Sequence, residues 1–358
     1  MSDICAATHN SRDRQTLMSS QAVSEVAAPQ DRVMRPLFVF SVVRSGSSLL
    51  YSLLNQNSQI ALLYEAELPM LNLFLRGTFR SGEWMERWEF WNQGPSRNGL
   101  DLSSIPRDVA NVWEATRAAY QSVATRKGAA IWGEKTPHSC RFASRIAKNF
   151  PDARLIFLWR DLNGVMGSIT RAGVTSRSFR KSGLFREVVF GTEQLRQTCD
   201  RLKARGRCVY EIDYEELTSN PAECMRQICR FLDVPYEEKM ASLEGADRSA
   251  IFSAEHHTLV RGNRIVNNSK QREKLPAALQ TKAERYICRW RCRYAERWPK
   301  YPLQLPEGTR PPGLLEFWRD WAAYRLRIFR EQVMVVLLHQ VRPLFVTKKY
   351  VRRSEVVS

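Results

Sequence analysis

The chain alternates between short apolar runs typical of buried strands and stretches with apolar residues at helical spacing. Residues 37–43 are dense in β-branched and aromatic side chains, which predicts a buried strand. The leucines of residues 49–54 then fall on one face of a helix. A second strand pattern covers residues 154–159, and apolar residues at helical spacing follow it. Strands that alternate with helices predict an α/β fold, a parallel sheet with helices on both faces.

A loop of small polar residues joins the first predicted strand to its helix. It consists of Ser45, Gly46, Ser47 and Ser48, and Arg44 precedes it. Backbone N–H groups at a helix N-terminus stabilise phosphate or sulfate groups. A nucleoside triphosphatase loop reads G-x-x-x-x-G-K-[ST], but here Ser47 occupies the lysine position and the cation is Arg44. The loop therefore favours a less highly charged anion than a metal-bound triphosphate.

A second pair of anion-binding residues is predicted around the strand at 154–159. Arg160 ends this strand, and Asn163 is placed to cap the helix that follows it. Ser168 lies two turns into that helix. An arginine at a strand end and a serine on the next helix can hold a second phosphate together.

The two sites resemble motifs of the sulfotransferase family that uses 3′-phosphoadenosine 5′-phosphosulfate (PAPS). The family's P-R-S-G-T-T loop corresponds to residues 43–48, with Val43 for the proline and serines for the threonines. The family's 3′-phosphate motif has R-D-P and then a serine eight residues after the arginine. Arg160 and Ser168 keep that spacing, whereas Leu162 replaces the proline. The resemblance implies a P-loop-like α/β fold and PAPS as the sulfuryl donor, without a metal.

Weaker likenesses extend the resemblance to about residues 35–275. Tyr214 lies in a segment similar to the family's Y-E-x-L, which supports the substrate or the nucleotide. Arg261, Gly262 and Asn263 resemble the late loop that closes over the nucleotide, although the common R-K-G triplet is absent.

The resemblance also implies catalytic roles, because the layout is nearest to the protein-tyrosine and bacterial branches of the family. Glu65 ends an apolar run that suits a second strand, and it corresponds to the catalytic glutamate, the general base. Glu67 is the near alternative. Lys135 corresponds to the lysine at the leaving oxygen, while Arg44 and Ser48 are expected to hold the phosphosulfate.

Histidines are rival bases, because a neutral imidazole takes a proton readily near pH 7. His138 follows Lys135 closely, and His256 and His257 precede the late loop. The sequence leaves the choice between glutamate and histidine open.

The charge of the chain points to anionic partners. The formal net charge is +18 at pH 7, which favours PAPS, acidic acceptors or anionic lipid as ligands. No nucleic-acid motif accompanies the basic residues, so nucleic acid is not favoured. The eight cysteines are irregularly spaced, and this pattern favours reduced thiols over a zinc site.

The pattern divides the chain into three segments. Residues 1–32 are polar and predict a disordered extension. Residues 33–300 form the predicted catalytic domain, in which tryptophans at helical spacing within 84–91 predict a helical insertion over the substrate. Residues 301–358 predict a basic, amphipathic, helical extension. Such a helix can lie on an anionic membrane surface or pack against its own domain, and the sequence leaves both open.

We therefore expect a cytoplasmic PAPS-dependent sulfotransferase that acts on an acceptor hydroxyl and releases adenosine 3′,5′-bisphosphate. The cytoplasmic location follows from the lack of a signal peptide or spanning segment in the sequence. A P-loop kinase and a non-catalytic nucleotide-binding scaffold are the alternatives. The acceptor stays open among glycan, lipid, peptide and small alcohol, and so does the oligomeric state.

Overall fold

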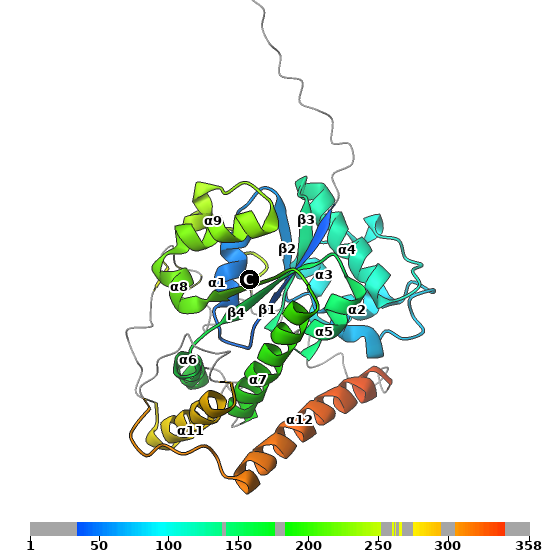
Figure 1. The fold of residues 1–358 in the computed structure, drawn as a ribbon. Coiled ribbons are helices and arrows are strands. Elements are labelled where there is room, and N and C mark those ends of the chain that lie inside the picture. The colour runs from blue at the N-terminus through cyan, green and yellow to red at the C-terminus, as the bar shows by residue number, and fades with distance from the viewer. Residues whose placement is uncertain are drawn as a thin grey trace, which may run out of the picture. The chain divides into compact units, whose positions relative to one another are not determined.

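A computed structural model describes residues 34–137, 141–175, 183–251, 260, 262, 265–266, 275–294 and 305–340. In this part of the chain, five parallel strands form one sheet in the order β2-β3-β1-β4-β5 (Figure 1). The strands are β1 (Arg35–Phe40), β2 (Ile60–Tyr64), β3 (Ile131–Lys135), β4 (Arg154–Trp159) and β5 (Val209–Asp213). The α/β fold with a parallel sheet is confirmed.

Side chains of the central strand alternate between the two faces of the sheet, as the pleat requires. Leu37 and Val39 pack with the helices of one face, including α1 (Ser47–Leu54) and α9 (Pro221–Leu232). Phe38 packs on the opposite face in a second apolar cluster. Both faces are therefore covered, and ligands can reach the sheet at the carboxyl ends of its strands.

Helices and short 3-10 turns fill the connections between the strands. Those on the side of Phe38 and in the insertion after β2 are η1 (Leu68–Leu73), α2 (Trp84–Asn92), α3 (Gly94–Arg97), η2 (Leu102–Ser104), α4 (Val112–Lys127) and α5 (Ala143–Asn149). Those that follow β4 and β5 are α6 (Leu162–Thr175), α7 (Gly183–Ala204), α8 (Tyr214–Ser219) and η4 (Glu238–Ala241). Trp84 and Trp88 of the predicted insertion are fully buried, so these tryptophans serve core packing.

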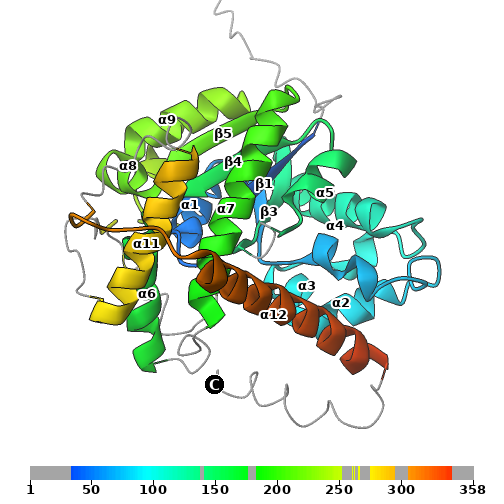
Figure 2. The ribbon, with the colours of Figure 1, turned by 60° about the horizontal axis from the view of Figure 1, so that its bottom comes forward.

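Two further helices cover α6 and α7. They are α11 (Ala277–Tyr294) and α12 (Leu314–Gln340). The apolar cluster of this region joins α6, α7 and α11 with Tyr324 of α12. Figure 2 shows α12 crossing in front of α7. Within the C-terminal extension predicted from the sequence, α12 therefore packs against the domain along one of its faces.

None of the described helices is both long enough and apolar enough to cross a membrane. Among the same residues, no group of three or more His, Cys, Asp or Glu side chains is arranged to hold a metal ion.

Candidate active site

The predicted anion loop lies between the carboxyl end of β1 and the start of α1. Gly46 precedes the helix with φ +92°, and Arg44 also has a left-handed backbone, with φ +65°. A Cβ atom on Gly46 would lie 2.2 Å from Cδ2 of Tyr214. Glycine is therefore required here for two reasons, the backbone conformation and the close approach of an aromatic ring.

The predicted second phosphate pair contacts this loop directly. Arg44 Nε donates a hydrogen bond of 3.1 Å to Ser168 Oγ, and Arg160 Nη1 donates one of 2.9 Å to the carbonyl oxygen of Arg44. The Arg160 guanidinium also lies 4.0 Å from the centre of the Tyr214 ring. Residues that follow β1 and β4 thus meet residues of α6 and α8 in one cluster, and the two predicted anion sites adjoin.

Positive charge accumulates in this cluster. Burial, followed by the nearby charge of Arg160, lowers the pKa of Arg44 to about 10. Burial and then Arg160 also lower the pKa of Arg171, which lies one turn after Ser168 on α6. Arg171 was not predicted as a site residue from the sequence, although its spacing of three residues from Ser168 puts both on one helix face. A dianionic group would relieve this repulsion between cations.

Orphaned polar atoms give an independent test of whether the site fits a phosphate. Ser45 Oγ and Arg160 Nε are buried without a hydrogen-bond partner among the described residues. Buried donors are ordinarily paired. A hydroxyl and a guanidinium N–H are both donors to phosphate oxygens. The residues of the cluster therefore fit a phosphorylated ligand.

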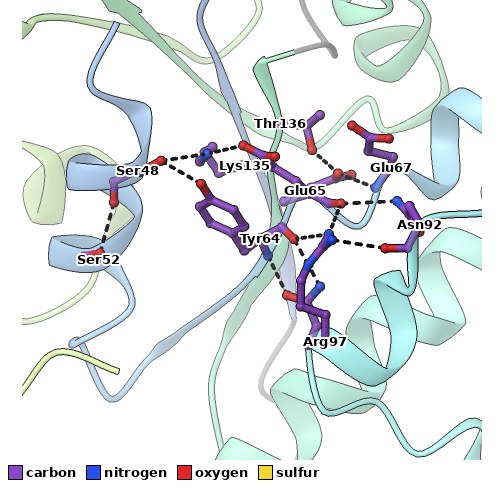
Figure 3. Close-up of polar contacts among 11 residues, drawn as sticks. Ser48, Ser52, Tyr64, Glu65, Glu67, Asn92, Arg97, Lys135 and Thr136 are labelled. Atoms are coloured by element: carbon purple, nitrogen blue, oxygen red, sulfur yellow. Dashed lines mark hydrogen bonds and ion pairs between the residues drawn. The ribbon is translucent and has the colours of Figure 1, made fainter. Parts of the chain in front are cut away.

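The two catalytic candidates form an ion pair at the ends of neighbouring strands. Lys135 Nζ lies 2.8 Å from Glu65 Oε1 and 3.3 Å from Ser48 Oγ (Figure 3). The Lys135 side chain is fully buried, and burial lowers its pKa, although Glu65 acts in the opposite direction. The lysine therefore connects the candidate base to the first turn of α1, which follows the anion loop.

Tyr64, which was not predicted as a site residue from the sequence, packs its ring against Lys135. Lys135 Nζ is 3.9 Å from the centre of the Tyr64 ring, and the Tyr64 hydroxyl lies 2.8 Å from Ser48 Oγ. Burial, followed by the charge of Glu65, raises the pKa of Tyr64 well above its usual value. Tyr64 therefore stays protonated and orients Lys135 and Ser48.

A buried carboxylate supports the turn that carries Glu65. Glu134 accepts hydrogen bonds from the Tyr120 hydroxyl at 2.7 Å and from the backbone N–H of Glu67 at 2.6 Å, and it also contacts the Thr136 hydroxyl. Burial raises the pKa of Glu134, whereas these donors lower it. The network fixes the backbone of Glu67, and the carboxylate joined to Lys135 in Figure 3 is that of Glu65. By position, Glu65 is the better candidate for the base.

Strained backbone concentrates in the same turn. Glu65 and Glu67 have φ of +47° and +63°, values that residues other than glycine rarely adopt. Arg97 Nη2 and Asn92 Nδ2 donate to the carbonyl oxygen of Glu65 at 2.5 and 3.3 Å, and so hold this conformation. Such strain persists only where the surroundings impose it, and it gathers at functional sites.

Several sequence predictions fall outside this cluster. Arg261 and Asn263 lie outside the described residues, as do the three rival histidines. The carbonyl oxygen of Gly262 accepts a hydrogen bond of 3.3 Å from Arg248. The prediction for Asn163 is wrong, because α6 begins before it. The Asp161 carboxylate caps this helix by accepting from the N–H of Gly164 at 3.1 Å.

Comparison with known proteins identifies the family. The model of the sulfotransferase family matches residues 36–238, more than half of the chain, so the chain belongs to this family. A protein-tyrosine sulfotransferase of Drosophila melanogaster is 25% identical over 214 residues, which are 58% of this chain and 40% of that protein. Protein-tyrosine sulfotransferase A of Caenorhabditis elegans is 23% identical over 208 residues, 57% of this chain and 51% of that protein. The chain spans about half the length of these curated relatives.

Solved structures support the same fold. The sulfotransferase domain from the curacin biosynthetic pathway aligns with a TM-score of 0.51 and 18% identity, over 72% of this chain and 98% of that domain. The sulfotransferase domain of the Synechococcus PCC 7002 olefin synthase aligns with a TM-score of 0.50 and 20% identity, over 72% and 95%. At these identities the likeness concerns the fold.

Proposed function

We propose that the chain transfers the sulfuryl group of PAPS to an acceptor hydroxyl and releases adenosine 3′,5′-bisphosphate. The observation that carries this proposal is the position of Lys135 Nζ between Glu65 Oε1 and Ser48 Oγ, at 2.8 and 3.3 Å. Sulfuryl transfer requires a base at the acceptor oxygen and a cation at the leaving oxygen. Here one lysine joins the candidate base to the candidate anion loop.

The donor supplies an activated sulfuryl group and carries phosphates at two positions. In the proposal, residues 45–48 and Arg44 bind the phosphosulfate end, since they surround the N-terminus of α1. Arg160 and Ser168 bind the 3′-phosphate. The hydrogen bond from Arg44 to Ser168 links the two subsites, so that both ends of one nucleotide can be held together.

In the proposed reaction, Glu65 takes the proton of the acceptor hydroxyl while the acceptor oxygen forms a bond to sulfur. The bond from sulfur to the bridging phosphate oxygen breaks, and its electron pair stays on that oxygen. Lys135 and Arg44 neutralise this charge. Protonation of Glu65 also cancels its attraction for Lys135, so the lysine becomes available to the leaving oxygen when charge develops there.

The acceptor we propose to test first is a tyrosine hydroxyl in a peptide. The support is the name of the relatives, which are protein-tyrosine sulfotransferases. Glycan, lipid and small alcohols are the other acceptors to include in the same assay. The cytoplasmic location inferred from the sequence stays a prediction.

Cofactor choice separates this proposal from the kinase alternative. A ligand at a hundred times its dissociation constant stabilises a protein by about 2.7 kcal/mol. We expect adenosine 3′,5′-bisphosphate to raise the melting temperature strongly and Mg-ATP to raise it little. Arg160→Gln should remove most of this shift, whereas Arg126→Gln, an exposed arginine on α4, should leave it intact.

Turnover with sulfur-labelled PAPS and a tyrosine peptide then separates an enzyme from a scaffold. Equal stabilisation by Mg-ATP, or a preference for it, would overturn the choice of donor. Strong binding of the bisphosphate without transfer to any of the four acceptor classes would favour the non-catalytic alternative.

A further inference from the structure

One face of α12 is bound to the domain through a buried carboxylate. Asp320 is fully buried and accepts from Arg186 Nε at 2.8 Å, Lys282 Nζ at 2.7 Å and the Tyr286 hydroxyl at 3.0 Å. One turn later, the Tyr324 ring stacks on Phe190 of α7 at 5.4 Å between centroids. These contacts fix the rotation of α12 about its own axis.

The opposite face of α12 is apolar and exposed. Its large side chains have exposed fractions from 38% for Trp321 to 87% for Leu315. The set is Leu314, Leu315, Trp318, Trp321, Leu326 and Phe329; we call it the outer face. These six residues are most of the exposed large apolar side chains found in the described part of the chain. Water is an unfavourable environment for a continuous surface of this kind.

Charge on the exposed side of α12 has a single sign between residues 314 and 330. Arg319, Arg325 and Arg330 are exposed among the apolar side chains. The two acidic residues of this stretch, Glu316 and Asp320, are paired with cations of neighbouring helices. Asp320 is buried, and Glu316 lies 2.8 Å from Arg285 of α11. Both acidic residues are therefore engaged in contacts with the domain. The charged side chains that remain exposed beside the tryptophans are arginines.

We propose that the outer face of α12 binds the surface of an anionic lipid bilayer, with the helix lying in the plane of the headgroups. Tryptophan, phenylalanine and leucine insert at the boundary of headgroups and acyl chains, and the three arginines pair with lipid phosphates. The chain's net charge of +18 adds to the attraction. This proposal is independent of the transfer reaction.

A second copy of the chain fits this surface poorly. Two outer faces in a symmetric contact would bring six arginines together without an acid from residues 314–330 between them, and like charges repel. A partner protein would need acidic groups spaced along a row of aromatic rings. A bilayer offers both an apolar layer and mobile phosphates, so it satisfies both features of the face at once.

The test is flotation of the full-length chain with vesicles of phosphatidylcholine, with and without phosphatidylglycerol. We expect binding to the anionic vesicles that decreases as salt is raised. Replacing Arg319, Arg325 and Arg330 by glutamine should weaken the partition by about 100-fold, since each basic residue contributes near an anionic surface. The matched control replaces Arg126, Arg205 and Arg230 by glutamine. These arginines are also exposed and carry the same total charge, but they lie outside α12.

A second pair of variants tests insertion. Trp318→Ser/Phe329→Ser should abolish binding to anionic vesicles, whereas Leu73→Ser/Phe90→Ser, which also removes two exposed apolar side chains, should leave it unchanged. Equal effects of an outer-face variant and its control would overturn the proposal, as would failure of the unaltered chain to float at low salt. A lower melting temperature of the outer-face variants would also overturn it, because it would mean that these side chains pack within the protein.

Discussion

The ring of Tyr214 lies where a side chain on Gly46 would be, with Cδ2 only 2.2 Å from the position of a Cβ atom. Tyr214 also stacks beneath the Arg160 guanidinium, 4.0 Å from ring centre to Cζ. A single aromatic ring therefore couples the shape of the anion loop to the position of the second arginine. This coupling joins the two halves of the proposed nucleotide site.

Gly46→Ala should therefore abolish nucleotide binding, since it forces Tyr214 to move and Arg160 with it. We expect the melting shift with adenosine 3′,5′-bisphosphate to disappear. A left-handed backbone at alanine adds a cost of roughly 1–2 kcal/mol to folding. Gly99→Ala is the control, because Gly99 has φ +62° but nothing within 4 Å of its Cβ position. If both variants keep the shift, the coupling through Tyr214 does not govern binding.

Glu65→Gln should lower turnover by about 10² to 10⁴, the range typical of a lost general base. Its dissociation constant for adenosine 3′,5′-bisphosphate should change little, because Glu65 pairs with Lys135 and is assigned to the acceptor hydroxyl in the proposed reaction. The carboxylate of Glu65 raises the pKa of Lys135, so its removal lowers the pKa of that lysine further. The alkaline limb of the residual pH profile should then move to lower pH. Glu67→Gln is the control, and a larger loss there would assign the base to Glu67.

The sequence predicts the strands that are continuous apolar runs, and it predicts the anion loop from small residues beside an arginine. It does not predict β3, although every residue of Ile131–Lys135 is buried. Gly133, Glu134 and Lys135 break the apolar pattern for reasons visible only in three dimensions. A Cβ on Gly133 would lie 1.7 Å from the carbonyl oxygen of Leu37 on the paired strand. The side chains of Glu134 and Lys135 can be buried because Tyr120 donates to Glu134 and Glu65 pairs with Lys135.

The same limit applies to the C-terminal helix. Its pattern of apolar and basic residues is compatible with docking and with an exposed amphipathic face. The structure shows both, on opposite sides of α12. Asp320 determines which side of α12 docks, because it pairs with Arg186 of α7 and Lys282 of α11. These partners are distant in sequence, so the pairing cannot be predicted from the pattern of α12 alone. From composition alone, an acidic residue is expected at the surface, whereas Asp320 is fully buried.

Lys135→Met should abolish turnover without destabilising the protein. The folded pKa of Lys135 lies below its ordinary value of 10.5 because of burial. Lys135 therefore binds a proton more readily in the unfolded chain than in the folded one, and burying the charged lysine lowers the free energy of unfolding at neutral pH. This loss of stability fades as pH rises toward 10.5. Replacing both partners of a buried ion pair by apolar groups is often neutral or stabilising by about 1–4 kcal/mol. Lys135→Met leaves Glu65 behind, but 17% of the Glu65 side chain is exposed, so water can solvate the remaining carboxylate. We expect urea unfolding to show equal or greater stability at pH 7 and a smaller difference in alkaline buffer. A loss above about 2 kcal/mol would show that the Glu65 pair stabilises the fold, contrary to this argument.

Asp320→Ala should destabilise the docking of α12, because it leaves the cations of Arg186 and Lys282 without their shared carboxylate. Breaking a buried pair in this way costs about 3 kcal/mol. Burial raises the pKa of Asp320, but hydrogen bonds from Lys282 and Arg186 outweigh it, so the net pKa is below 3.8. The stabilisation is therefore present above this value and is lost as pH falls through the folded pKa.

Urea unfolding at neutral pH and in acid measures both parts of the Asp320 prediction. The difference between Asp320→Ala and the unaltered chain should be full at neutral pH and should shrink in acid. Glu316→Ala is the matched control, since it removes a more exposed acid of α12 paired with Arg285. Ion pairs that water can reach contribute about 0–1 kcal/mol, and the Glu316 and Arg285 side chains are 23% and 34% exposed, so this variant should stay closer to the unaltered chain than Asp320→Ala. Equal effects of the two variants would mean that burial of Asp320 does not hold α12 against the domain.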